Sequence, residues 1–421
     1  MSTLILHRFP LEPFPYAEWL ADHPGDLLVV AGRDRIEGAG ERVPDGPLGC
    51  TRLEVIDTLD DTALLERTAR RLIEEHAVRH VVTLHEADQL RAARLRAQYG
   101  LPGALPADVV PFRDKALMKR WASAAGLAVA PHAIPRDAVA AREFAEVHGF
   151  PVVLKDRAGF SSIGLRIVRD GPALDAALAA AFGAGPRDDL LIEAFVPGRM
   201  CHVDGLVAGG ATVLAWPSQY QYDLASFGSD PGARVDLTLD PADPLTPRLL
   251  DFTERALAAL RPAGSRLTDH AFHAEIFHTP DDRLVLCEIA CRPAGAKIRE
   301  VFQAIFGIDH AAYAVRAQLG LPLPLLDGTG PLPVPSRMAG QVLMMKRPGR
   351  ISAVPEAPGE DWVERFWLYG RPGETVPPAA GSSDFLLAAV GTGPDRAVCE
   401  RRLRTLGARF EAAVRIGGAA A

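Results

Sequence analysis

Two runs of alternating apolar and polar residues flank a turn in the segment Phe272–Gly295, which reads FHAEIFHTPDDRLVLCEIACRPAG. The residues between them, 280–283, are Pro-Asp-Asp-Arg and are typical of a tight turn that joins two strands. If the two aspartates form the centre of this turn, antiparallel pairing places Glu275 directly opposite Glu288. The pattern therefore predicts a hairpin in which two carboxylates face each other across the strands.

Because side chains alternate between the faces of a strand, this hairpin should have one polar and one apolar face. The polar face would carry His273, Glu275, Phe277, Leu286, Glu288, Ala290 and Arg292. The apolar face, which we expect to pack in the core, would carry Ala274, Ile276, Val285, Cys287, Ile289 and Cys291.

The two opposed carboxylates have a specific chemical implication. Like charges directly across a strand pair repel, so such a pair persists when one acid is protonated, when cations flank it, or when a metal ion binds between the two. Mg2+ takes oxygen ligands and usually keeps phosphate oxygens as partners. Arg292 lies on the same predicted face and suits a phosphate or a carboxylate. The alternative interpretation is a solvated strand face with incidental charges.

Residues 1 to about 110 alternate between predicted strands and helices, which indicates a small parallel α/β domain. The strands are Leu27–Ala31 and Val78–Leu84, and the helices are Thr62–Glu75 and Glu86–Tyr99. No GxGxxG sequence follows the first strand, so a dinucleotide site has little support here. We expect this domain to support a neighbouring site.

Two lysines stand on one predicted helix after a Pro-rich linker at Pro106–Pro111. The helix should run from Lys115 to Ala125, with Asp114 as its N-cap. Lys115 and Lys119 are one turn apart and share a face. The alternative interpretation is a pair of solvated lysines.

A third lysine lies inside the apolar strand Phe150–Asp156. Lysines are seldom buried without a partner, and Lys155 is followed by a loop, 157–168, that contains glycines and serines. Such a loop can turn amides and hydroxyls toward an anion, although it lacks the GxxxxGKS/T pattern and is more often an ordinary turn. The strand lysine favours a phosphate site, with loop candidates Gly159, Ser161, Ser162 and Gly164.

The middle of the chain supplies further candidates. The strand Leu190–Val196 contains Glu193, and its edge could read an adenine. The strand Arg199–Val207 contains two polar residues, and the stretch 216–230 is loop-like and suited to line a pocket. The pocket candidates, each equally compatible with ordinary packing, are His202, Trp216, Tyr220 and Tyr222.

Bulk properties exclude several classes. At 421 residues the chain suggests several domains. A net charge of -7 gives no excess of basic residues, so we expect no nucleic-acid partner. No apolar run is long enough to span a bilayer, so we expect no membrane partner and cytoplasmic residence. The five cysteines are scattered, and we expect free thiols.

The order of these features resembles the ATP-grasp superfamily. Within it, the chain is most similar to carboxylate–amine ligases of the L-amino-acid (dipeptide) ligase type. The similarity lies in the segments RDKALMKRWASAAGLAVAP, FHAEIF and LCEIACRPAGAKI.

The resemblance implies an α/β and α+β multidomain protein with the ATP-grasp fold. Its parts would be an N-terminal parallel α/β domain, a mobile lid subdomain with the helix that leads into it, a large antiparallel catalytic subdomain, and a C-terminal α/β portion packed on the latter. The corresponding boundaries are 1–110, 111–192, 193–335 and 336–421.

The resemblance also implies roles for residues at the matching positions. Lys115 and Lys155 would contact ATP phosphates, and the loop from Gly159 through Ser161 and Ser162 to Gly164 would close over them. The adenine would lie against Glu193, Ala194, Phe195 and Val196. Glu275 and Glu288 would hold Mg2+, or Mn2+ in its place, Arg292 would bind the transferred phosphate, and His273 would face the substrate.

Two positions depart from the family pattern. The family commonly has Glu-x-Asn-x-Arg in the last strand, and here the middle residue is Ala290, so one metal ligand is lost. An acid that binds ribose commonly follows the hinge, and its place is taken by Met200, for which Asp204 could substitute.

The function that the resemblance implies is an ATP-dependent ligase. It would activate a small-molecule carboxylate as an acyl phosphate, release ADP, and join the acyl group to an amine. Amino-acid substrates would give a dipeptide or a related amide. A homodimer is expected only because dimers are the commonest oligomers. The alternatives are the same chemistry with a carrier-protein thiol or bicarbonate as acceptor, and a nucleotide-binding module without catalysis. Candidate substrate contacts are His202, Trp216, Tyr220, His273 and Arg292.

Overall fold

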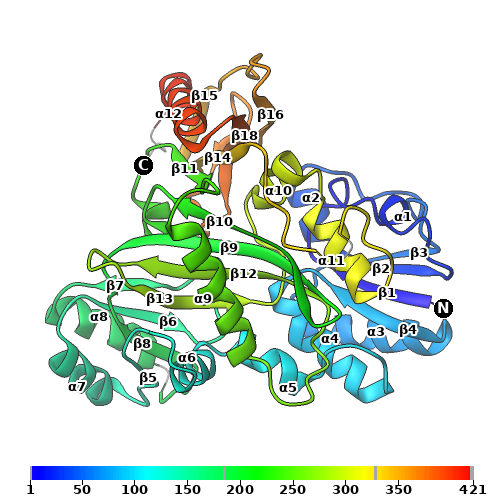
Figure 1. Ribbon diagram of the computed structural model, residues 1–421, viewed down its shortest axis with the longest axis horizontal. Helices are drawn as coiled ribbons and strands as arrows, with labels where there is room; N and C mark the ends of the chain where they lie inside the picture. Colours follow the sequence, from blue (N-terminus) through cyan, green and yellow to red (C-terminus); the bar gives the residue numbers. More distant parts are fainter. Residues whose placement is uncertain (1, 184, 327–329, 418–421) are drawn as a thin grey trace.

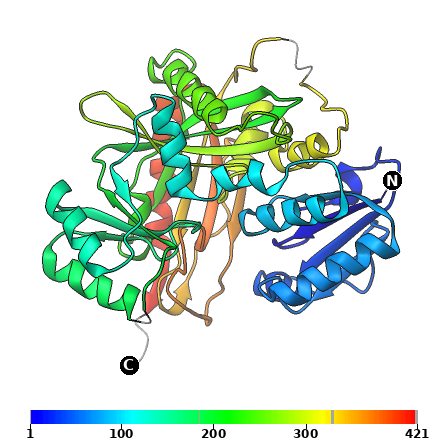
Figure 2. The ribbon, with the colours of Figure 1, turned by 90° about the horizontal axis from the view of Figure 1, so that it is seen from below.

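The computed structural model describes residues 2–183, 185–326 and 330–417. It contains three main sheets, and Figures 1 and 2 both place the N-terminal sheet and the small sheet on opposite sides of the large one. The fold class predicted from the sequence, ATP-grasp with a parallel N-terminal α/β domain and a large antiparallel sheet, is confirmed, and the small sheet is also antiparallel. The domain boundaries stay a prediction.

The N-terminal sheet is parallel, with the order β3-β2-β1-β4. Its strands are β1 (Ser2–His7), β2 (Leu27–Gly32), β3 (Arg52–Ile56) and β4 (Val78–Thr83). Its helices are α1 (Tyr16–Trp19), α2 (Arg33–Gly38), α3 (Thr62–Glu75) and α4 (Glu86–Tyr99). Helix α4 ends where Gly100 adopts a φ of 62°, a left-handed conformation that glycine allows at no steric cost.

The predicted linker at Pro106–Pro111 is wrong, because these residues form α5 (Pro106–Val109) and most of a 3-10 turn, η1 (Val110–Phe112). Proline is tolerated in the first turn of a helix, where an N–H would have no partner within the helix. The next helix, α6 (Lys115–Ala124), begins as predicted at Asp114, whose carboxylate accepts N–H groups from the first turn.

The small sheet is antiparallel and has the order β5-β8-β6-β7. Its strands are β5 (His132–Ala133), β6 (Val152–Asp156), β7 (Arg166–Val168) and β8 (Leu190–Ala194). Helices α7 (Ala138–His148) and α8 (Gly171–Phe182) cover one face and form a core with Val152, Leu154 and Ile192. The other face is left to Lys155 and Glu193, which stand on neighbouring strands.

The large sheet has eight strands in the order β13-β12-β9-β10-β11-β14-β18-β16. They are β9 (Arg199–Ala208), β10 (Ala211–Tyr220), β11 (Arg234–Thr238), β12 (His270–His278), β13 (Leu284–Ala290), β14 (Met338–Met345), β16 (Val363–Leu368) and β18 (Phe385–Gly393). Three strands from residues beyond 336 therefore extend the same sheet. The helices that pack on it are α9 (Leu245–Ala259), α10 (Ile298–Phe306), α11 (His310–Gln318) and α12 (Arg396–Ala413).

The sequence predicts a loop over residues 216–230. This prediction is wrong for residues 216–220, which complete β10. Trp216 is only 3% exposed and packs in the core, where its indole N–H donates to the Leu239 carbonyl at 3.0 Å. A short 3-10 turn, η2 (Leu224–Gly228), lies in the remainder. A fourth sheet, beside the three main ones, joins β15 (Gly349–Ala353) to β17 (Thr375–Val376) and β19 (Arg415–Gly417).

The hairpin pairs Glu275 with Glu288, as the sequence predicts, but two irregularities compensate each other. At the turn, Thr279 pairs with Arg283 and not with Leu284, the partner that the predicted register implies. The Thr279 N–H donates to the Arg283 carbonyl at 2.9 Å. A bulge at Cys287, between the Ile276–Leu286 and Glu275–Glu288 pairs, then restores the expected register at the carboxylates. The predicted faces of three residues are therefore wrong, because Val285 pairs with Phe277, Leu286 packs in the core and Cys287 lines the cavity described below.

Among the helices of the described ranges, none is long and apolar enough to cross a membrane.

Candidate active site

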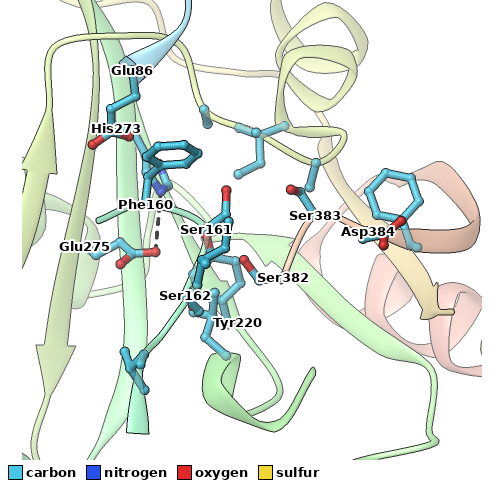
Figure 3. Close-up of a pocket in the computed structure, with 18 of the residues that line it drawn as sticks. Glu86, Phe160, Ser161, Ser162, Tyr220, His273, Glu275, Ser382, Ser383 and Asp384 are labelled. Atoms are coloured by element: carbon cyan, nitrogen blue, oxygen red, sulfur yellow. Dashed lines mark ion pairs between the residues drawn. The ribbon is translucent and has the colours of Figure 1, made fainter. Parts of the chain in front are cut away.

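A cavity of about 1510 Å³ opens where the three main sheets meet. Figure 3 shows His273 and Glu275 on one side of it and Ser382, Ser383 and Asp384 on the other, with Ser161 and Ser162 between them. Of the residues predicted for the site, the wall includes Lys115, Lys155, Gly159, Ser161, Ser162, Glu193, Ala194, Phe195, Val196, Tyr220, His273, Glu275, Glu288 and Arg292. The structure does not bring Gly164, His202, Asp204 or Trp216 to this wall.

Two lysines share one buried carboxylate at the wall of the small sheet. Lys155 Nζ lies 3.0 Å from Glu193 Oε2, and Lys119 Nζ lies 3.3 Å from Glu193 Oε1. Burial acts to lower the pKa of Lys155, but the Glu193 charge prevails and raises it above its usual range. Burial likewise acts to raise the pKa of Glu193, and the two lysines lower it instead. Lys155 and Glu193 are therefore both charged at neutral pH.

Lys119 is a member of the site that the sequence reasoning missed. It is 1% exposed and donates to the Cys287 carbonyl at 2.9 Å, so the interpretation as a solvated lysine is wrong for it. The signal was present in the sequence, because Lys119 shares a helix face with Lys115.

The two hairpin carboxylates differ in their neighbours. Glu288 Oε2 lies 3.3 Å from Lys115 Nζ, and that ammonium also donates to the Gly159 carbonyl at 2.6 Å. Burial opposes ionisation of Glu288, yet Lys115 and then Lys155 lower its pKa to about 2. Glu275 Oε1 lies 3.5 Å from His273 Nε2. The loop after β6 is thereby linked to the hairpin through Lys115.

The donor set at the hairpin fits a hard divalent cation. Donor atoms of Glu275, Cys287 and Glu288 lie within 4.8 Å of one another. Burial raises the pKa of the Cys287 thiol to about 12, so this sulfur is protonated and is a poor ligand. The two carboxylates remain, and oxygen ligands are those that Mg2+ prefers.

Arg292 makes an ion pair that the sequence did not indicate. Its Nε and Nη2 atoms donate to Glu86 Oε2 at 2.9 and 2.6 Å, and Arg113 pairs with the other oxygen of this carboxylate. Glu86 is 4% exposed and opens α4, directly after β4. Ligands of parallel α/β sheets bind beyond the carboxyl ends of the strands, and this rule could have singled out Glu86.

A buried network lies beneath the cavity wall and explains why two predicted residues do not reach it. The carboxylate of Asp204 lies 2.5 Å from His202 Nδ1 and 2.8 Å from His273 Nδ1. His202 Nε2 in turn lies 3.0 Å from Asp236. Burial acts to lower the pKa of His202, but Asp236 and Asp204 raise it to about 10. His202 is therefore a buried imidazolium that orders two strands.

The glycine–serine loop rests on a segment from the C-terminal part of the chain. The Ser382 N–H donates to the Ser161 carbonyl at 3.1 Å, and the two segments meet across the cavity in Figure 3. Ser161 and Ser162 have φ values of 53° and 56°, a conformation that non-glycine residues seldom adopt. The wall also includes Met200, which occupies the place of the expected ribose acid.

Comparisons with known proteins agree with this geometry. Residues 114–204 match the family model of the carbamoyl-phosphate synthase L chain ATP-binding domain. The chain is 22% identical over 259 residues to the L-arginine-specific L-amino acid ligase of Bacillus subtilis, covering 61% of each chain. It is 32% identical over 200 residues to the D-alanine–D-alanine ligase of Streptomyces coelicolor, covering 43% of this chain and 49% of that one. The matches thus span about three fifths and about half of these relatives' lengths.

Two solved structures show the same fold along the whole chain. The L-amino acid ligase of Bacillus licheniformis superposes with a TM-score of 0.73 at 16% identity, covering 100% of this chain and 99% of that one. The biotin carboxylase of Campylobacter jejuni superposes with a TM-score of 0.67 at 17% identity, covering 99% and 92%. The matched ATP-binding segment contains Lys115, Lys119, Lys155 and Glu193, all of which line the cavity. The three-sheet fold extends over all described residues. The chain therefore has the ATP-grasp fold, and its residues 114–204 resemble an ATP-binding domain.

Proposed function

We propose that this protein is an ATP-dependent carboxylate–amine ligase that activates a carboxylate as an acyl phosphate and joins it to an amine, with amino acids as substrates. The observation that carries the proposal is the meeting of Glu275 and Glu288 with Lys115, Lys155 and Arg292 in one cavity. The sequence similarity to an L-amino acid ligase and to D-alanine–D-alanine ligases supports it.

The reaction that this arrangement suits has two steps. A carboxylate oxygen of the first substrate attacks the terminal phosphorus of ATP, and ADP leaves. The amine of the second substrate then attacks the acyl carbon, phosphate leaves, and the amine loses a proton. Neither step needs a covalent bond to the protein, so its task is positioning and charge neutralisation.

The residues of this chain divide that task. Lys115 and Lys155 would neutralise nucleotide phosphates, and the adenine would lie against Glu193 to Val196, which line the cavity. The carboxylates of Glu275 and Glu288 would hold Mg2+, which would supply charge neutralisation on the phosphates when bound. Arg292 would stabilise charge on the transferred group, held in place by Glu86. The loop of residues 159–164 would exclude water, because an acyl phosphate hydrolyses readily.

The experiment that tests the proposal is a screen for substrate-dependent ADP release. The full chain is incubated with ATP, Mg2+ and pairs of the protein amino acids, and products are identified by mass spectrometry. ADP release that requires two amino acids, with an amide product, supports the proposal. ADP release with bicarbonate or with a thiol in place of the amine, or ATP binding without turnover for any pair, contradicts it.

The homodimer remains part of the proposal. One solved structure of the same fold, the biotin carboxylase domain of a Hydrogenobacter thermophilus 2-oxoglutarate carboxylase, is described as a dimer. Light scattering on the purified protein tests this, and a monomer at all concentrations contradicts it.

A further inference from the structure

The lysines of this chain are few and are confined to one place. Lysine and arginine together number 46, yet only five of these residues are lysines. All five line the cavity: Lys115, Lys119, Lys155, Lys297 and Lys346. Arginine carries the positive charge elsewhere, and a compact ammonium is not interchangeable with a guanidinium. The composition therefore indicates that each cavity position requires an ammonium group and not a guanidinium.

Four of the five have a close partner. Lys115, Lys119 and Lys155 bind the carboxylates at the nucleotide end of the cavity. Lys346 Nζ lies 2.7 Å from Asp384 Oδ1. Lys297 is the one whose presence the proposed chemistry leaves unexplained.

The ammonium of Lys297 is bracketed by aromatic rings and has no close acceptor among the described residues. Its Nζ lies 3.9, 5.6 and 5.8 Å from the ring centroids of Trp367, Tyr369 and Phe385. The nearest carboxylate is Glu300 Oε1 at 4.0 Å, which is beyond hydrogen-bond distance. Lys297 is 9% exposed, and burial above all lowers its pKa to about 8. Its N–H donors are therefore available to a group in the cavity.

The position of Lys297 is fixed by the buried network. Its backbone N–H donates to Gln341 Oε1 at 2.8 Å, and Gln341 Nε2 donates to Asp236 Oδ2 at 2.9 Å. Asp236 is the carboxylate that also binds the His202 imidazolium. Lys297 is moreover the N-cap of α10, and the first turn of this helix lines the cavity. A helix N-terminus favours negative charge. The ammonium of Lys297 and the N-terminus of α10 therefore both attract an anionic group to this part of the cavity.

We infer that Lys297 and the N-terminus of α10 form a subsite for a substrate carboxylate that is not the one being activated. The inference rests on the proposed function. The activated carboxylate must lie near Glu288, on β13, the first strand of the large sheet. Lys297 packs on Trp367 and Phe385, which belong to β16 and β18 at the opposite end of that sheet. One carboxylate cannot occupy both places, so the substrates carry a second.

This second carboxylate has two sources that the experiment must separate. It is either the α-carboxylate of the amine substrate or the additional carboxylate of a dicarboxylic substrate. The probes are the twenty protein amino acids beside their C-terminal amides, which test the first source. Aspartate against asparagine, and glutamate against glutamine, test the second.

The measurement is the thermal shift of the full chain, saturated with MgADP, as each probe is titrated. The variants are Lys297→Met, which removes the charge and keeps an apolar contact with the rings, and Lys297→Arg, which keeps the charge. Lys346→Met is the matched control, because this lysine already has Asp384 as a partner. The shift caused by MgADP alone reports the nucleotide site and the fold in each variant.

The inference predicts that at least one carboxylate probe binds about tenfold or more weakly to Lys297→Met, while its amide binds both proteins equally. Lys297→Arg should bind that probe within a few-fold of the wild type, and Lys346→Met should bind it like the wild type. Undiminished binding to Lys297→Met, equal loss of a carboxylate probe and its amide, or no probe binding at all overturns the inference. A missing MgADP shift in the wild type instead contradicts the proposed function.

Discussion

The buried group Lys119–Glu193–Lys155 permits a prediction whose size follows from its geometry. Replacing Glu193 by Gln removes the one carboxylate that neutralises both ammonium groups. Lys119 keeps the Cys287 carbonyl as an acceptor, whereas Lys155 keeps no other ion-pair partner among the described residues. Removing one partner of a buried pair costs about 3–5 kcal/mol. Because the Gln amide oxygen can still accept a hydrogen bond, we expect about 3 kcal/mol, the lower end of that range.

The loss of stability should be measurable in the small sheet, which contains Glu193 and Lys155. A two-state unfolding curve is unsuitable for a chain of several domains, so the assay is native-state hydrogen exchange of peptides that cover β6 and β8. A loss of about 3 kcal/mol in the local opening free energy accelerates their exchange about 150-fold. The double variant Glu193→Gln with Lys155→Met should recover part of the protection, because it removes the unpaired charge. Lys119→Met should cost less than Glu193→Gln, since the Glu193–Lys155 pair remains.

The reasoning is refuted if Glu193→Gln exchanges at the wild-type rate in these peptides. It is also refuted if adding Lys155→Met makes exchange faster still, because the cost would then come from lost packing and not from an uncompensated charge.

Three further predictions concern the site. Arg292→Ala should lower ADP release about a hundredfold or more with an unchanged circular dichroism spectrum, and near-normal release would remove Arg292 from the mechanism. Glu288→Gln should raise the Mg2+ concentration needed for half-maximal ADP release, whereas an unchanged requirement would show that the ion binds elsewhere. Stability should fall as pH rises from 6.5 to about 10, because the raised pKa of His202 gives a stabilisation that is complete below its unfolded value of 6.5 and is lost as pH passes the folded value. Local opening free energies from hydrogen exchange of peptides that cover β9 and β11, measured across that range, test this, and His202→Gln should flatten the profile; equal slopes for the two proteins would contradict it.

The hairpin shows how far a sequence pattern reaches. Alternation of side chains was enough to pair Glu275 with Glu288. It could not place Leu286 and Cys287, because the turn and the bulge each shift the register by one residue and cancel at the carboxylates. Beside the bulge, the Leu286 N–H donates to the Ala128 carbonyl at 2.9 Å and Lys119 donates to the Cys287 carbonyl, and these contacts with distant residues cannot be read from the local sequence.

Other features were hidden because their cause is distant in the sequence. Trp216 lies in a strand that contains Pro217, and a proline inside a run argues against a strand. The pairing of β10 with β9 overrides this local signal. The partnership of Glu86 with Arg292 joins residues 206 positions apart, and only the fold brings them together. Helices with a capping residue and a clear period, such as α3 and α6, were predictable to within a residue or two.

The continuity of the large sheet has a practical consequence for anyone who wishes to shorten this protein. Strands β14, β18 and β16 come from the last part of the chain, and β14 pairs directly with β11. A truncation near residue 335 would strip β11 of its neighbour and expose a row of unsatisfied backbone groups. Bare strand edges of this kind recruit other chains. The strands that follow residue 335 thus cover a strand edge of the sheet that carries the site, and a shortened chain should be designed to keep them.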